Sequence, residues 1–158
     1  MARERDAEYK PLSFSTTMRN PSRIADFLKC ILPYEGQVLT NEIIMNVATS
    51  LIKKKLYRPM YIGRTPRLRS ILNEEREFTD LEVNEIIQNS PQNHKEAGFD
   101  KGWPSRFDTW YKLPMEFGFL YYEMNAPIEI SITGHMLIDA HNETPVNDEK
   151  IKNVFLNS

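Results

Sequence analysis

Residues 103–134, WPSRFDTWYKLPMEFGFLYYEMNAPIEISITG, contain the pattern that decides the fold. Pro104 suits the first turn of a helix, and large aromatic residues then recur at helical spacing. Two β-rich runs follow, separated by an Asn-Ala-Pro turn. The stretch therefore predicts a helix over 104–115, strained or ended by Pro114, and directly after it a β-hairpin over 119–132.

The residues before this stretch predict further helices. Asn20-Pro21 is a strong helix start, and the apolar stripe behind it ends before Pro33. A second helix begins at Thr40 or Asn41 and runs to the Lys53–Lys55 cluster. A short amphipathic helix over 66–72 follows, and Thr79 with Glu82 predicts a capping box at the start of another.

Helices followed by a two-stranded hairpin are the order of a winged helix-turn-helix, so we expect a mainly α protein with a small β-hairpin, of α+β class. In that architecture 104–115 is the recognition helix and 119–132 the wing. The division expected along the chain is a poorly ordered lead-in over 1–10, a helical N-terminal subdomain over 11–90, a winged-helix unit over 91–146, and the start of a truncated helix over 147–158.

Composition excludes several classes of protein. The chain has 158 residues, 41% of them hydrophobic and 27% charged, which suits one globular domain and no fibrous or disordered class. No apolar run approaches the length of a membrane span, and the charged residues at the N-terminus do not resemble a secretory signal. The lone Cys30 lies among apolar residues and predicts a buried structural thiol. We therefore expect a cytoplasmic protein without membrane contact.

The net charge of −2 conceals an uneven distribution. Seven basic residues and no acid occur over 53–73, and residues 74–85 then hold six acids and one Arg. This basic island predicts contact with a polyanion, with four candidate phosphate contacts. They are Arg58, Arg64, Arg67 and Arg69. The alternative is a solvated helix end and loop, because cations are favoured in the last turn of a helix.

The predicted recognition helix has a polar face opposite its aromatic one. Arg106, Thr109 and Lys112 have the chemistry for reading base edges and holding phosphate, and Ser105 and Lys101 would lie near the DNA backbone. Asp108 beside them would repel phosphate unless it pairs with Arg or accepts from a cytosine amine. The alternative is an exposed helix face with ordinary charges.

The aromatic residues between 103 and 122 could stack on unpaired bases, but their spacing favours packing in a core. A metal-dependent nuclease would need paired acids with a Lys, and Asp139 with Asp148-Glu149-Lys150 matches the residue types of that pattern. Both segments predict helices, however, whereas that pattern belongs on paired strands. The three His complete no zinc site. From the residues alone we expect no catalytic residue and no metal ligand in this chain.

Two blocks of the sequence resemble the N-terminal part of AlwI-type restriction endonucleases. They are LSFSTTMRNPSRI over 12–24 and GFDKGWPSRFDTW over 98–110. Residues 118–137 are similar to the wing and following helix of that family's recognition module, and related nicking enzymes have a similar strand, turn, strand ending. The resemblance covers nearly everything after residue 10.

This resemblance implies a type IIS restriction-modification system. In such a system an N-terminal module binds an asymmetric site in double-stranded DNA, and a separate nuclease domain with Mg²⁺ cuts a few bases away. Family members are several times longer, and the part with the metal-binding residues is absent here. The expectation is a truncated or split chain that recognises DNA without cutting it, completed by a nuclease domain or subunit encoded downstream.

Two other functions stay open from the sequence. A winged-helix protein without nuclease ancestry could bind DNA or a protein partner as a regulator. A small self-sufficient nuclease would use Asp139 and Lys150 with Mg²⁺.

Overall fold

The computed structural model describes residues 21–95, 98–143 and 148–156. In these residues the chain is mainly helical with a small two-stranded antiparallel sheet, which confirms the predicted α+β class. The lead-in predicted over 1–10 lies outside the described residues.

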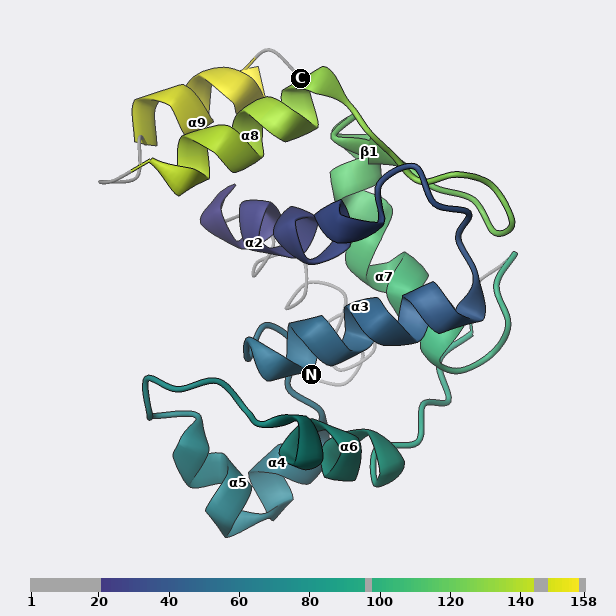
Figure 1. Cartoon of the computed structure of the whole chain (residues 1–158), viewed down its shortest axis with the longest axis vertical. Coiled ribbons are helices and arrows are strands. Elements are labelled where there is room, and N and C mark those ends of the chain that lie inside the picture. Colours follow the sequence, from purple (N-terminus) through teal and green to yellow (C-terminus); the bar gives the residue numbers. More distant parts are fainter. Residues whose placement is uncertain (1–20, 96–97, 144–147, 157–158) are drawn as a thin grey trace, which may run out of the picture.

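Three helices form the centre of the molecule, α2 (Pro21–Ile31), α3 (Asn41–Lys53) and α7 (Trp103–Glu116). They begin where the sequence predicts, because a proline suits the first turn of α2 and of α7, and the Thr40 hydroxyl accepts a hydrogen bond from the Ile43 N–H at the start of α3. The three helices contact one another pairwise (Figure 1).

Helix α7 continues through Pro114 to Glu116 and does not end at the proline. Pro114 lacks an N–H, but its carbonyl still accepts a hydrogen bond from the Phe119 N–H at 3.1 Å. The Phe117 N–H likewise donates to the Leu113 carbonyl at 3.0 Å. These bonds complete the last turn, so the proline shapes the helix without terminating it.

A short β-hairpin follows α7, as predicted. Strand β1 (Leu120–Tyr121) pairs antiparallel with β2 (Glu129–Ile130), with Leu120 opposite Ile130 and Tyr121 opposite Glu129. Leu120 and Ile130 are buried, whereas Tyr121 and Glu129 are exposed, which is the alternation of a strand with one face on the core.

The loop of the hairpin is held by the segment that joins α2 to α3. Val38 forms an isolated β-bridge with Pro127. Backbone hydrogen bonds flank the bridge, and the shortest runs from the Gly36 N–H to the Ile128 carbonyl at 2.7 Å. Residues 36–39 therefore pair with the hairpin as a third segment and tie it to the helical core.

Helix α8 (Ile132–Asn142) packs on α2, and α9 (Asp148–Leu156) packs on α8 (Figure 1). The Ser131 hydroxyl caps α8 by accepting a hydrogen bond from the Gly134 N–H at 3.0 Å. A Cβ at Gly134 would lie 2.2 Å from the Phe119 carbonyl oxygen. The first turn of α8 thus approaches the hairpin backbone more closely than any side chain allows.

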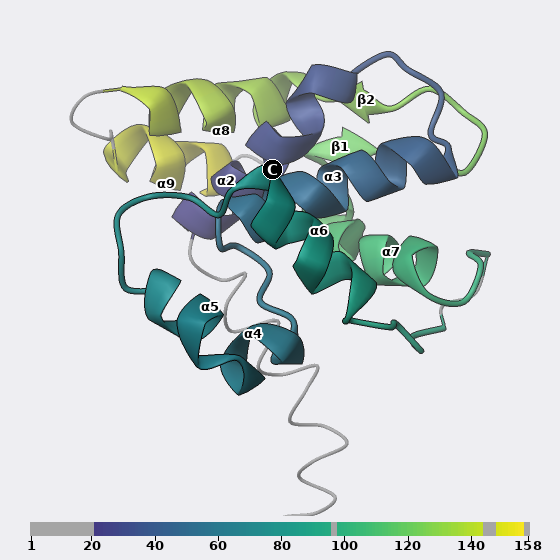
Figure 2. The same cartoon turned by 60° about the horizontal axis from the view of Figure 1, so that its bottom comes forward.

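Three helices lie between α3 and α7 in chain order and are called the helical insert below: α4 (Met60–Arg64), α5 (Pro66–Ile71) and α6 (Asp80–Gln88). Thr79 and Glu82 form the predicted capping box of α6. In Figure 2, α4 and α5 project from the body of the molecule beside α6. A second, smaller apolar core joins the insert to the end of α3 and is made of Ile52, Ile62, Leu68, Ile71, Phe78, Val83 and Ile86.

Most of the aromatic residues between 103 and 122 pack inside the molecule, which confirms the packing interpretation. The rings of Phe107 and Tyr111 lie 4.9 Å apart, and the Tyr111 hydroxyl donates to the Phe27 carbonyl at 2.7 Å. Tyr121 is the exception and is 51% exposed. Within the described residues, no helix has both the length and the apolar character needed to cross a bilayer.

The main core joins helices that the sequence placed in separate subdomains. Helix α7 packs on α2 and α3, although the predicted division fell at residue 90 between them. Core packing therefore unites the two ends of the described chain around the insert.

Candidate functional site

The polar face of α7 lies against the segment that precedes the helix. The Arg106 Nε donates to the Gln92 Oε1 at 2.9 Å, and the Arg106 guanidinium lies over the Tyr57 ring at 6.0 Å. The Thr109 hydroxyl is hydrogen-bonded to His94 and donates to the Ser105 carbonyl. Arg106 and Thr109 are both half-buried. The structure therefore brings these two predicted residues together, but engages them with residues 92–94.

Lys112 lies further along the same helix and is exposed. Its Nζ is 3.6 Å from the Asp108 Oδ2. Asp108 itself is buried, and its Oδ1 accepts a hydrogen bond of 2.6 Å from the Tyr122 hydroxyl. The carboxylate that would have repelled phosphate thus points inward and fastens α7 to the hairpin.

Ser105 is fully buried, which corrects its expected position near the DNA backbone. Its hydroxyl donates to the Asp100 carbonyl at 2.7 Å and to the Phe99 carbonyl at 3.3 Å, so it closes the turn that leads into α7. The physical reason is the direction of the first helical turn, which carries this side chain toward the core. Lys101, two residues before the start of α7, is exposed.

The basic island folds against the acids that follow it in the sequence. Lys53 pairs with Asp80 at 2.8 Å, and Arg67 pairs with Glu85. Lys54 also lies 3.8 Å from Glu77. Much of the positive charge predicted from the sequence is therefore matched by carboxylates within the helical insert. Arg67, one of the four predicted phosphate contacts, is among these pairs.

Two carboxylates of the helical insert, Glu82 and Glu85, are held in their charged form. Hydrogen bonds from Arg76 are the main reason that the pKa of Glu82 falls to about 2, and the Thr79 N–H adds to the effect. Hydrogen bonds from Tyr61 and Arg67 lower the pKa of Glu85. These carboxylates stay ionised at neutral pH and keep neutralising the cations beside them.

Three arginines of the predicted set have no acidic partner in the described part of the chain, namely Arg58, Arg64 and Arg69. Arg58 donates to the Lys55 carbonyl at 3.2 Å, and Arg69 donates to the Gly63 carbonyl at 3.1 Å. Hydrogen bonds to carbonyls orient a guanidinium without cancelling its charge. All three are exposed and lie on or beside α4 and α5.

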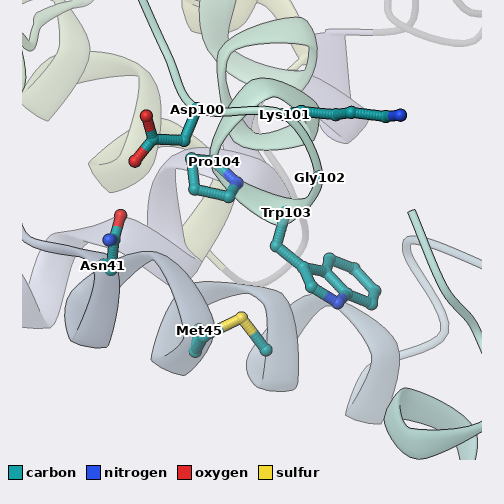
Figure 3. A pocket seen from close by; sticks show the side chains of 7 residues that line it. All are labelled: Asn41, Met45, Asp100, Lys101, Gly102, Trp103 and Pro104. Atoms are coloured by element: carbon teal, nitrogen blue, oxygen red, sulfur yellow. The ribbon is translucent and has the colours of Figure 1, made fainter. Parts of the chain in front are cut away.

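A pocket of about 400 Å³ lies between the start of α3 and the start of α7. Asn41 and Met45 line it from α3, and residues 100–104 line it from α7 and the preceding turn. Figure 3 shows the Asp100 carboxylate and the Asn41 amide on the same side of the pocket, with the Lys101 chain extending away from it. Sequence reasoning missed this site, because its two halves are separated by more than fifty residues.

The structure also places the thiol and the acidic and basic side chains that the sequence analysis considered as nucleophile or nuclease residues. Burial raises the pKa of the Cys30 thiol to about 12, so this residue is a core side chain and not a nucleophile. Lys150, proposed for a nuclease site, donates to Glu143 at 2.8 Å, whereas Asp139 is an exposed residue of α8. Among the described residues, no cluster of three or more His, Cys, Asp or Glu side chains could hold a metal ion.

Fold and site together define a mainly helical α+β protein in which a hairpin is anchored on three helices and an arginine-bearing helical insert separates the second from the third. Comparison with protein-family models, with curated proteins and with solved structures found no match for this chain.

Proposed function

We propose that this chain is a sequence-specific recognition module for double-stranded DNA, built as a winged helix-turn-helix and acting in a type IIS restriction endonuclease of the AlwI type. The observation that carries the proposal is the order and packing of the central elements. Helix α2, segment 36–39, helix α3, helix α7 and the hairpin occur in the order of a winged helix, with segment 36–39 paired to the hairpin.

In this arrangement α7 is the recognition helix and the helical insert is an addition between the second and third helices. The recognition helix of such modules presents its N-terminal residues to base edges. Lys101 and Lys112, both exposed, would lie on the DNA side of α7. Arg106 and Thr109 would reach DNA only after their hydrogen bonds with Gln92 and His94 are broken.

The helical insert supplies the sequence-independent part of the binding. Arg58, Arg64 and Arg69 keep their charge at its surface and would contact phosphates. Each phosphate contact releases counterions, so it contributes roughly 0.9 to the slope of log K against log salt. We expect three such contacts from the insert and none from Arg67, because Arg67 is paired with Glu85.

The test is binding of the purified chain to random duplexes over a range of salt concentrations. We expect binding at low salt that weakens steeply as salt rises. Arg64→Ala should reduce the slope by about one unit, and the triple Arg58→Ala, Arg64→Ala, Arg69→Ala variant by about three. Arg76→Ala is the matched control, because Arg76 is paired with Glu74 and Glu82 and should leave the slope unchanged.

No binding to any duplex at low salt would overturn the proposal. The resemblance places cleavage in a separate Mg²⁺-dependent nuclease domain or subunit, so the chain alone should bind without cutting. Mg²⁺-dependent nicking by the pure chain would contradict that part and favour a nuclease that uses Asp139 and Lys150.

One observation favours the alternative of a winged-helix regulator that binds a protein. The hairpin presents Tyr121, Glu123 and Glu129 at the surface, and carboxylates there repel phosphate. Such a surface suits a basic protein partner. This alternative gains support if the triple arginine variant and an Arg106→Ala, Lys112→Ala variant bind DNA as wild type does, while Glu123→Gln, Glu129→Gln abolishes binding to a protein partner.

A further inference from the structure

The pocket between α3 and α7 has unused hydrogen-bonding groups beside an apolar wall. In the part of the chain that the structure describes, neither the Asp100 carboxylate nor the Asn41 amide has a hydrogen-bond partner. Met45, Trp103 and Pro104 form the apolar side of the pocket (Figure 3). An ionised carboxylate only accepts hydrogen bonds, whereas an amide both donates and accepts.

This combination selects a flat group that donates hydrogen bonds at its edge. An exocyclic amine can donate to the Asp100 carboxylate, and the Asn41 amide can bind the same amine or, in adenine, the neighbouring ring nitrogen N7. Groups that offer only acceptors are repelled by the carboxylate. The pocket volume of about 400 Å³ accommodates a single base edge.

We propose that this pocket reads the major-groove edge of one amino-bearing base, adenine or cytosine, through Asp100 and Asn41. The inference rests on the proposed function, and it assigns to this site a discrimination between amino bases and keto bases. Adenine and cytosine present an amine in the major groove, whereas guanine and thymine present carbonyl oxygens at the corresponding position.

The position of the pocket in the fold supports this assignment. It lies at the N-terminal end of α7, the end that a recognition helix presents to base edges. Further along α7, Arg106 and Thr109 are engaged with residues 92–94. The end of the helix with unused polar groups is therefore the end with Asp100 and Asn41.

Lys101 would contribute to the affinity for DNA but not to the choice of base. Its side chain extends away from the pocket, so it can hold a phosphate while Asp100 faces a base (Figure 3). One cation beside the carboxylate also offsets the repulsion between Asp100 and the DNA backbone.

The test is selection of bound sequences from a random duplex pool by the full chain and its variants. For wild type we expect one position that is occupied by adenine or cytosine and excludes guanine and thymine by roughly 10-fold or more. Asp100→Asn replaces an acceptor by a side chain that can also donate, so keto bases should become tolerated at that position. Asn41→Ala should weaken the preference at the same position.

Two controls separate base reading from general effects. Glu42→Gln makes the same carboxylate-to-amide change at an exposed residue next to Asn41 that does not line the pocket, and should leave the selected sequences unchanged. Lys101→Ala should weaken binding to all sequences alike. Thermal melting of each variant checks that the fold is retained, which is expected because both pocket side chains are exposed.

The outcomes separate this inference from the proposed function. Wild-type binding with no amino-specific position, or an unchanged preference in Asp100→Asn, overturns the inference and leaves DNA binding intact. A folded Asp100→Asn variant that loses all sequences equally also overturns it. If wild type binds no duplex at low salt, the proposed function fails first and the inference falls with it.

Discussion

The central core and the helical insert are stabilised by different interactions. In the core, large rings from distant parts of the chain are buried together, and the Tyr111 hydroxyl reaches a carbonyl 84 residues away. In the insert, a small apolar core is bordered by ion pairs at the surface, such as Arg76 with Glu82 and Arg67 with Glu85. Exposed ion pairs contribute little, about 0–1 kcal/mol each, whereas a buried aromatic ring contributes several.

This difference shows that the number of basic residues in a segment does not by itself determine the electrostatic potential at its surface. The basic island predicted contact with a polyanion along its length, but Lys53 and Arg67 form ion pairs with carboxylates of the insert. Arg58 and Arg69 donate instead to backbone carbonyls, so no carboxylate offsets their positive charge. Arg67 and Arg69, two residues apart on α5, thus end with opposite electrostatic roles.

The largest expected effect tests whether the two regions are independent. Phe107→Ala should lower the free energy of unfolding by about 3–5 kcal/mol, because it leaves a cavity in the main core. Phe78→Ala, the matched change in the insert, should speed amide hydrogen exchange in α6 far more than in α7. Denaturant unfolding and hydrogen exchange measure these effects. Equal acceleration in both helices would show that core and insert open as one unit.

A second pair of variants compares a closely packed glycine beside the hairpin with an unpacked glycine in the insert. Gly134→Ala should destabilise the chain by about 1–3 kcal/mol, because its Cβ would lie 2.2 Å from a backbone oxygen that cannot move aside. Gly63→Ala in α4 meets nothing within 4 Å and should stabilise the insert by up to about 1 kcal/mol through helix propensity. Thermal unfolding distinguishes the two, and a neutral Gly134→Ala would contradict the close approach of α8 to the hairpin.

The tyrosines on the hairpin offer a smaller contrast. Tyr122→Phe removes the donor to the buried Asp108 carboxylate and should cost about 1–2 kcal/mol of unfolding free energy. Tyr121→Phe removes only an exposed hydrogen bond to Glu123 and should change stability by about 0.5 kcal/mol or less. Chemical denaturation of both variants provides the comparison, and equal costs would argue against a role for Asp108 in fastening the hairpin.

The smallest effect is a pH dependence located in the insert. Because the folded pKa of Glu82 is lowered to about 2, its ion pair with Arg76 stabilises the fold above the ordinary pKa of 4.5 and is lost as pH falls toward 2. We expect about 1 kcal/mol, since both partners are partly exposed to solvent. Unfolding measured from pH 5 to pH 2 should show that Glu82→Gln loses less stability than wild type. Parallel curves for the two proteins would contradict this prediction.

Local sequence patterns predicted the elements well. Proline and threonine at helix starts, apolar residues at helical spacing and the capping box of Thr79 and Glu82 all act within a few residues, so they can be read without knowing the fold. Helix α4 was not predicted, because five residues are too few for a periodic pattern. The sequence left open whether Pro114 strains or ends α7, because the bonds that continue the helix are made by residues that follow the proline.

The candidate site was less predictable than the elements. The sequence identified cations and a polar helix face, but it could not show which cations meet carboxylates or that residues 92–94 cover Arg106 and Thr109. The turn into α7 buried Ser105, although its position in the sequence suggested exposure. Asn41 and Asp100 had no pattern in common, and only the packing of α3 against α7 brings them to one pocket.

By itself, the sequence determined the longer helices, the hairpin and the apolar faces, because these depend on backbone geometry and on hydrophobic periodicity over short distances. The tertiary structure alone decided which charges remain available and where polar groups from distant segments meet. Coulomb interactions and hydrogen bonds act through space over a few ångströms, so their partners are set by the fold and not by order along the chain. For this protein, the tertiary structure shows that Arg67 of the predicted set is paired with Glu85, and it adds a pocket at the beginning of α7 that the sequence did not indicate.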